Sequence, residues 1–79
     1  MTRAEFISNL KKNNIKEVIV NFEDIPKDGF IIRKGYNRWE VLYKERGKEY
    51  DCIGFPSESD ALIYLLERLQ SMYSLINNP

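Results

Sequence analysis

The chain has 79 residues, 43% of them hydrophobic and 30% charged, a balance typical of one small globular domain spanning residues 1–79. Twelve basic and twelve acidic residues cancel, which argues against a general binder of nucleic acid or of anionic membranes, because such proteins need a basic excess. The sequence contains no histidine and one cysteine, which excludes Ser-His-Asp and Cys-His nucleophilic sites, Cys/His zinc sites and an internal disulfide. A small chain without a disulfide framework is typical of a reducing compartment. No apolar run in the sequence resembles a signal peptide or a membrane span. We therefore expect a cytoplasmic protein.

The first predicted element is a helix from Thr2 to Asn13. Thr2 and Glu5 have the spacing of a capping box, in which each side chain accepts a hydrogen bond from the other residue's backbone N–H. Apolar side chains then recur at helical spacing, at Phe6, Ile7 and Leu10. Residues 15–22 are ambiguous, because their apolar spacing fits a helix whereas the β-branched run Val18–Val20 favours a strand. A strand is our preferred interpretation.

Three further strands are predicted in the middle of the chain. A turn at Pro26–Gly29 leads into the first, Phe30–Lys34. The second covers Arg38–Lys44, and a turn containing Gly47 joins it to the third, Glu49–Phe55.

Alternation along these strands predicts which side chains face the core. On the second strand it places one group toward the core: Trp39, Val41 and Tyr43. On the third strand it predicts that one face carries Tyr50, Cys52 and Gly54 and that the opposite face carries Asp51, Ile53 and Phe55. We expect Cys52 to be a small core residue rather than a reactive thiol.

A second helix is predicted after Ser57, which is a good N-cap, with Glu58 and Asp60 in the first turn. Its apolar residues recur every three or four positions, at Leu62, Leu65, Leu66, Leu69, Met72, Tyr73 and Ile76. Asn77, Asn78 and Pro79 are expected to end it. The sequence therefore predicts an α+β fold in the order α-(β)-β-β-β-α, with a three- or four-stranded antiparallel sheet and a helix at each end of the chain.

The titratable side chains form no recognisable catalytic site. Three carboxylate pairs could form an acid/base couple or hold a hard cation: Glu23/Asp24, Glu49/Asp51 and Glu58/Asp60. They fall in a loop, on a solvated strand face and at a helix start, where acids are ordinary. We therefore expect no enzymatic activity, no metal and no cofactor. The basic and aromatic residues Arg33, Lys34, Tyr36, Arg38 and Trp39 could form a sparse nucleic-acid patch, although charges flanking a turn are common on sheet surfaces.

Two resemblances to known families extend this interpretation. The element order resembles the double-stranded-RNA-binding domain, whose second helix begins with a basic cluster that contacts phosphates. The corresponding segment here, Ser57–Asp60, is acidic, so this likeness is one of topology. The segment Trp39–Leu69, preceded by Ile25–Lys34, resembles small bacterial immunity proteins of the polymorphic-toxin (contact-dependent inhibition) class. Matching residues are Trp39, Glu40, Val41, Tyr43, Glu45, Arg46, Gly47, Phe55, Glu58 and Ala61, with Asp60 in place of a glutamate.

The second resemblance implies a non-catalytic domain that binds a secreted toxin and neutralises it by occluding its active site or an essential surface. The expected partner-binding residues are Tyr36, Arg38, Glu40, Arg46, Glu58, Asp60 and Tyr64. The acidic ones, Glu40, Glu58 and Asp60, would suit a toxin with a basic groove. Two alternatives stay open: a nucleic-acid-binding accessory protein and an oligomeric domain that associates through an open sheet edge. We expect a protein partner and no membrane partner, and the oligomeric state is open.

Overall fold

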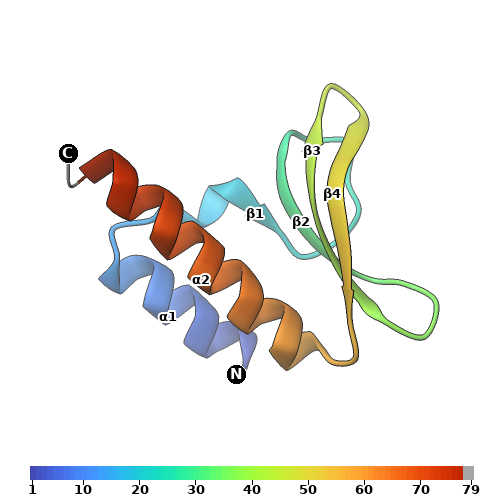
Figure 1. The fold of residues 1–79 in the computed structure, drawn as a ribbon, viewed down its shortest axis with the longest axis horizontal. Coiled ribbons are helices and arrows are strands. Elements are labelled where there is room, and N and C mark those ends of the chain that lie inside the picture. The colour runs from blue at the N-terminus through green and yellow to red at the C-terminus, as the bar shows by residue number, and fades with distance from the viewer. Residues whose placement is uncertain (78–79) are drawn as a thin grey trace.

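The computed structural model describes residues 1–77, leaving aside the side chains of residues 18 and 74–77. Two helices lie together on one side of a twisted four-stranded sheet (Figure 1). The elements in chain order are α1 (Arg3–Lys12), the 3-10 turn η1 (Glu17–Ile19), β1 (Val20–Asn21), β2 (Gly29–Lys34), β3 (Trp39–Glu45), β4 (Lys48–Phe55) and α2 (Glu58–Asn77). The predicted α+β fold is confirmed, with the strands in the spatial order β1-β2-β3-β4.

Both helices begin at the predicted caps. The Thr2 hydroxyl accepts a hydrogen bond from the Glu5 N–H at 3.2 Å, and the Glu5 carboxylate accepts one from the Thr2 N–H at 2.9 Å. At the start of α2, the Ser57 hydroxyl accepts a hydrogen bond from the Asp60 N–H at 3.1 Å. α1 ends at Lys12 with Asn13 as its C-cap, and the next residue, Asn14, adopts φ 57°, which asparagine tolerates better than most residues. Of the residues predicted to end α2, positions 78 and 79 lie outside the described part.

Residues 15–22 form a much shorter strand than predicted. The chain makes the η1 turn and then only the two residues of β1, which pair in parallel with β2. The sheet is therefore mixed at this edge, whereas β2, β3 and β4 pair antiparallel as expected. Parallel pairing requires the chain to return to the same end of the sheet, and residues 22–28 provide this connection. Gly29 then starts β2 at φ 129°, where a Cβ would lie 2.9 Å from the Ile19 carbonyl oxygen.

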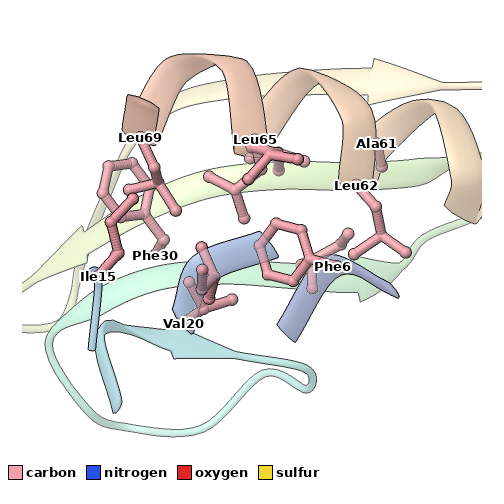
Figure 2. Packing of buried hydrophobic residues seen from close by; sticks show 12 residues of the cluster. Phe6, Ile15, Val20, Phe30, Ala61, Leu62, Leu65 and Leu69 are labelled. Carbon is pink, nitrogen blue, oxygen red and sulfur yellow. The ribbon is translucent and has the colours of Figure 1, made fainter. Parts of the chain in front are cut away.

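The core lies between the helices and the sheet face that we call the inner face (Figure 2). Its buried members are Phe6, Leu10, Ile15, Val20, Phe30, Ile32, Val41, Ala61, Leu62, Leu65, Leu66 and Leu69. The predicted α2 stripe is buried as far as Leu69. Met72 is instead 40% exposed, because it borders an open hollow beside Phe30 and Tyr43. Trp39 and Tyr43 are only partly buried, although both pack against the core.

A bulge in β4 changes which of its side chains face the helices. Val41 pairs with Ile53 but Tyr43 pairs with Tyr50, so that Asp51 and Cys52 together oppose Leu42. Asp51 adopts φ 54° at this point. The expectation of strict alternation along this strand is therefore wrong. So is the expectation that Cys52 lies in the core, because its side chain is exposed.

Because directly opposed residues share a sheet face, the bulge places three side chains on the inner face of β4: Tyr50, Ile53 and Phe55. On the opposite, outer face, Ile31 and Leu42 oppose one another in register and are also buried. We infer that residues 22–28 cover this pair, since Asp24 of that loop contacts Arg33 and Lys44 on the same face.

The α2 stripe should dominate stability. Leu65→Ala removes a fully buried side chain, so we expect the free energy of unfolding to fall by about 2–5 kcal/mol. The matched change Ile63→Ala, on the exposed side of the same helix, should cost less than about 1 kcal/mol. Chemical denaturation followed by circular dichroism measures both values. Equal losses would show that the assigned burial is incorrect.

Candidate protein-binding surface

The β2–β3 hairpin ends in a tip, Gly35–Arg38, that projects away from the helices (Figure 1). The Gly35 N–H donates a hydrogen bond to the Arg38 carbonyl oxygen at 2.7 Å, and Asn37 completes the turn with φ 57°. The Tyr36 side chain is 93% exposed. A large aromatic residue is thus presented on a closed turn, and tyrosine and arginine are enriched among the residues that dominate protein–protein binding.

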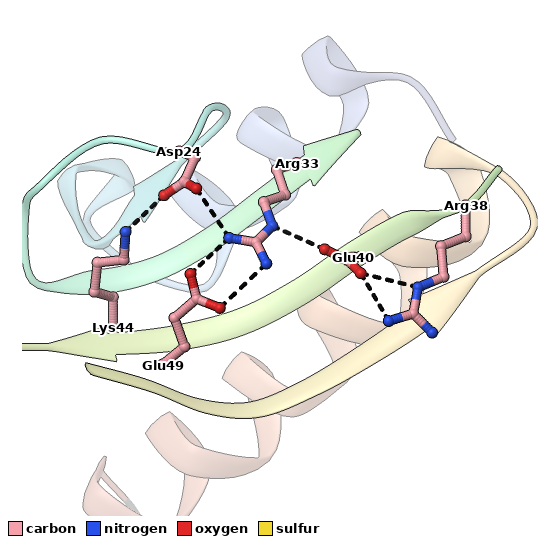
Figure 3. A network of polar contacts seen from close by, with 6 residues as sticks. All are labelled: Asp24, Arg33, Arg38, Glu40, Lys44 and Glu49. Carbon is pink, nitrogen blue, oxygen red and sulfur yellow. Dashed lines mark hydrogen bonds and ion pairs between the residues drawn. The ribbon is translucent and has the colours of Figure 1, made fainter. Parts of the chain in front are cut away.

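Arg33 is the centre of an ionic network on the outer face (Figure 3). Its Nε lies 2.8 Å from Glu40 Oε1 on β3. Its Nη1 lies 2.7 Å from Glu49 Oε2 on β4 and 3.0 Å from Asp24 Oδ2 in the 22–28 loop. One guanidinium therefore joins three separate segments to β2.

Two more cations complete this network. Arg38 Nη2 lies 2.7 Å from Glu40 Oε2, and Lys44 Nζ lies 2.6 Å from Asp24 Oδ1. The Glu40 side chain is only 12% exposed, so both of its oxygens are committed within the fold. Three cations thus face three carboxylates, and the network carries no net charge. Two of the three cations in the basic and aromatic cluster seen in the sequence, Arg33 and Arg38, are therefore paired with carboxylates, whereas Lys34 lies over Trp39.

The network perturbs the ionisation of its carboxyl groups. The hydrogen bond from Lys44 is the largest cause that lowers the pKa of Asp24. Hydrogen bonds from Arg33, and then from Arg38, lower the pKa of Glu40, while the hydrogen bond from Arg33 lowers that of Glu49. The hydrogen bond to Glu49 is the largest contribution that raises the pKa of Arg33. Each carboxyl is therefore stabilised in its charged form.

A groove of about 440 Å³ runs beside the tip, and its lining residues are Arg3, Phe22, Glu23, Asp24, Arg33, Lys34 and Trp39. The Arg3 guanidinium carbon lies 5.0 Å from the centre of the Phe22 ring, and Lys34 Nζ lies 5.3 Å from that of Trp39. Sequence reasoning missed this groove, because α1 and the 22–28 loop meet β2 only in the folded chain. No short motif indicates that contact.

The start of α2 lies at the same end of the sheet as the tip, because Trp39 pairs with Phe55 and the helix follows three residues later. Glu58 Oε2 is held by Arg3 Nη2 at 2.8 Å. The ammonium group of Met1 donates a hydrogen bond to Ser59 Oγ at 2.6 Å. Asp60 is exposed.

The seven expected partner-binding residues do not form one site. Tyr36, Arg38, Glu58 and Asp60 lie at one end of the sheet, whereas Arg46 lies in the β3–β4 turn at the other end. Glu40 is enclosed by two arginines. Tyr64 is half-buried, with its ring centre 5.0 Å from that of Phe55, and its hydroxyl accepts a hydrogen bond from Arg68 at 3.0 Å.

The chain matches no known family model, and comparisons with curated proteins and with solved structures found no significant similarity. Within residues 1–77, the acidic and cysteine side chains do not gather in groups of three or more that could hold a metal ion. In the same part of the chain, every helix is too short or too polar to cross a membrane.

The ionic network predicts a pH dependence of stability. Because the folded-state pKa values of Asp24, Glu40 and Glu49 lie below their unfolded values, the stability that they contribute is present above the unfolded values. It is lost as the pH falls through the unfolded values, about 4.3 for glutamate and about 3.9 for aspartate, and then through the lower folded values. Denaturation at a series of pH values should show this loss.

Arg33→Met should flatten the profile, because the carboxyl groups then titrate closer to their unfolded values. The wild-type and variant proteins should differ most near neutral pH and converge in acid. Lys34→Met on the same strand is the matched control, because its ammonium lies over Trp39 and outside the network, and it should keep the wild-type slope. A wild-type slope in Arg33→Met would contradict the role assigned to the network.

Proposed function

We propose that this chain is a non-catalytic protein-binding domain and, more specifically, a cytoplasmic immunity protein that neutralises a bacterial toxin by covering its active site or an essential surface. The observation that carries the proposal is the almost fully exposed Tyr36 on the closed Gly35–Arg38 tip. The resemblance of Trp39–Leu69 to immunity proteins supplies the specific class of partner.

The shape of the tip suits occlusion. Enzyme active sites are concave, and a projecting hairpin that ends in an aromatic ring is a convex element able to enter such a cleft. An aromatic side chain buried at the centre of an interface contributes through the apolar area that it removes from water. Because the tip is closed by its own hydrogen bond, little further ordering is needed on binding.

Charge plays a smaller part in this proposal than the sequence implied. Glu40 is paired with Arg33 and Arg38, and Glu58 is paired with Arg3, so these two acids are poor contacts for a basic groove. Asp60 remains exposed beside them. The same pairs weigh against nucleic-acid binding, because the guanidinium groups of Arg33 and Arg38 already donate to carboxylates.

The test begins with capture of a partner from the source cells, followed by an inhibition assay on any large secreted protein that is retained. Tyr36→Ala should weaken binding by at least about 30-fold, equivalent to about 2 kcal/mol, because the central anchor is lost. The expected loss of inhibition should follow the loss of affinity.

The matched control is Ile63→Ala, which truncates an exposed apolar side chain on α2 and should leave the affinity unchanged. Circular dichroism should confirm that both variants are folded. If Tyr36→Ala binds as tightly as the wild type, the tip is not the binding element. If the captured partner is active and uninhibited in the complex, the proposed neutralising role is wrong.

A further inference from the structure

β4 forms an edge of the sheet that is open to solvent. The strand order places it outermost (Figure 1), and every residue from Lys48 to Gly54 is exposed. An exposed edge strand presents unpaired backbone N–H and C=O groups and is a template for pairing with another chain. The opposite edge is the two-residue β1, which offers far less backbone for pairing.

The inner face of β4 carries an apolar row that the helices leave partly uncovered. Tyr50 is 45% exposed and Ile53 is 37% exposed, although both share the face on which the core packs. The row ends at Phe55, which contacts Tyr64 of α2. Lys48 belongs to the same row, because it opposes Glu45 in the register that places Tyr50 opposite Tyr43.

The two ends of this row differ in charge. Lys48 lies at its start, next to the exposed Arg46 of the β3–β4 turn. At its other end α2 begins, and Asp60 is exposed in the first turn of that helix. Glu45 opposes Lys48 at the first end, and Asp51 in the middle pairs with Arg68 of α2 at 3.6 Å. The surface therefore keeps an excess of positive charge at one end, exposed apolar side chains in the middle and an exposed acid at the other end. Under a two-fold rotation that runs the strands antiparallel, such a surface is complementary to itself.

We propose that β4 associates with β4 of a second copy of this chain, antiparallel and around a two-fold axis. Tyr50 and Ile53 of both copies form the apolar centre, and the basic Lys48 end of each copy lies beside Asp60 of the other. This inference rests on β4 and not on Tyr36, so it stands independently of the proposed function.

The bulge at Asp51 limits how far this pairing extends. It interrupts the regular ladder in the middle of β4, so the backbone can pair only in short stretches on either side. Side-chain contacts therefore contribute much of the association. Because a two-fold contact uses the same edge in both copies, the assembly closes as a dimer rather than growing into a longer sheet.

Cys52 allows the proposed dimer to be tested by disulfide cross-linking. It is exposed and lies next to the midpoint of β4, so full antiparallel overlap brings the two Cys52 residues close to the axis. Directly opposed residues in antiparallel strands have Cα separations that a disulfide can span. Mild oxidation should therefore link two copies through Cys52.

The experiment is sedimentation analysis of the full chain from about 10 μM to about 1 mM, under reducing conditions. The wild type should shift from monomer to dimer in this range. Ile53→Lys should raise the dissociation constant by at least about 10-fold, because it places like charges at the centre of the interface. Asp60→Lys should weaken the dimer and reverse its response to added salt.

Ile63→Lys is the control, since it adds the same charge at an exposed apolar position of α2 outside the row, and it should dimerise like the wild type. Oxidation should link the wild type and Ile63→Lys, link Ile53→Lys much less, and leave Cys52→Ser unlinked. A wild type that stays monomeric at about 1 mM would overturn the proposal, as would a dimer that Ile53→Lys does not weaken.

Discussion

A single guanidinium group holds the outer face of this fold together. Arg33 binds carboxylates from the 22–28 loop, from β3 and from β4, and it projects from β2 between them. Contacts from Asp24 to Arg33 and Lys44 place the loop on this face, and we infer that it covers the buried pair Ile31 and Leu42. Arg33 therefore links the ionic contacts of the surface to apolar burial on that side of the sheet. Loss of Arg33 removes the ion pair of Glu49 and leaves Glu40 with Arg38 and Asp24 with Lys44.

Because these charged side chains pair within the fold, they are less available to bind a partner. The sequence has twelve basic and twelve acidic residues, but those of the Arg33 network and Glu58 at the start of α2 are paired within the fold. Glu40 forms ion pairs with Arg33 and Arg38, and Glu58 forms one with Arg3. Among the large apolar side chains, Tyr36 is exposed on the hairpin tip, and Tyr50 and Ile53 are exposed on the β4 edge. The tip is the surface proposed for a foreign partner, and the β4 edge is the surface proposed for a second copy.

The sequence predicted those features that depend on neighbouring residues. The capping box at Thr2 and Glu5, the cap at Ser57 and the leucine stripe as far as Leu69 are all local patterns, and they are found as expected. Features set by tertiary contacts were missed. A strand with alternating side chains gives no sign of a bulge, since Asp51 at φ 54° is a position that glycine would more commonly mark. Exposure of Cys52 follows from that bulge and from the position of β4 at the edge.

The candidate site was predictable to a similar extent. Tyr36 and Arg38 stood out because they flank a turn, and the tip is where the sequence placed it. Glu40 was expected on the surface because it alternates with Trp39 and Val41, but alternation does not reveal that Arg33 and Arg38 enclose it. Those pairs join residues up to seven positions apart across two strands, and their geometry depends on the register of β2 and β3.

The most direct test of this account is an NMR titration of the side-chain carboxyl groups of Glu40 and Glu49 in the folded protein. If Arg33 holds both groups as described, their titration midpoints lie below the ordinary glutamate value of about 4.3, and both rise in Arg33→Met. Midpoints at the ordinary value, unchanged by that substitution, would show that the charges of the outer face are free and would contradict the central role of Arg33.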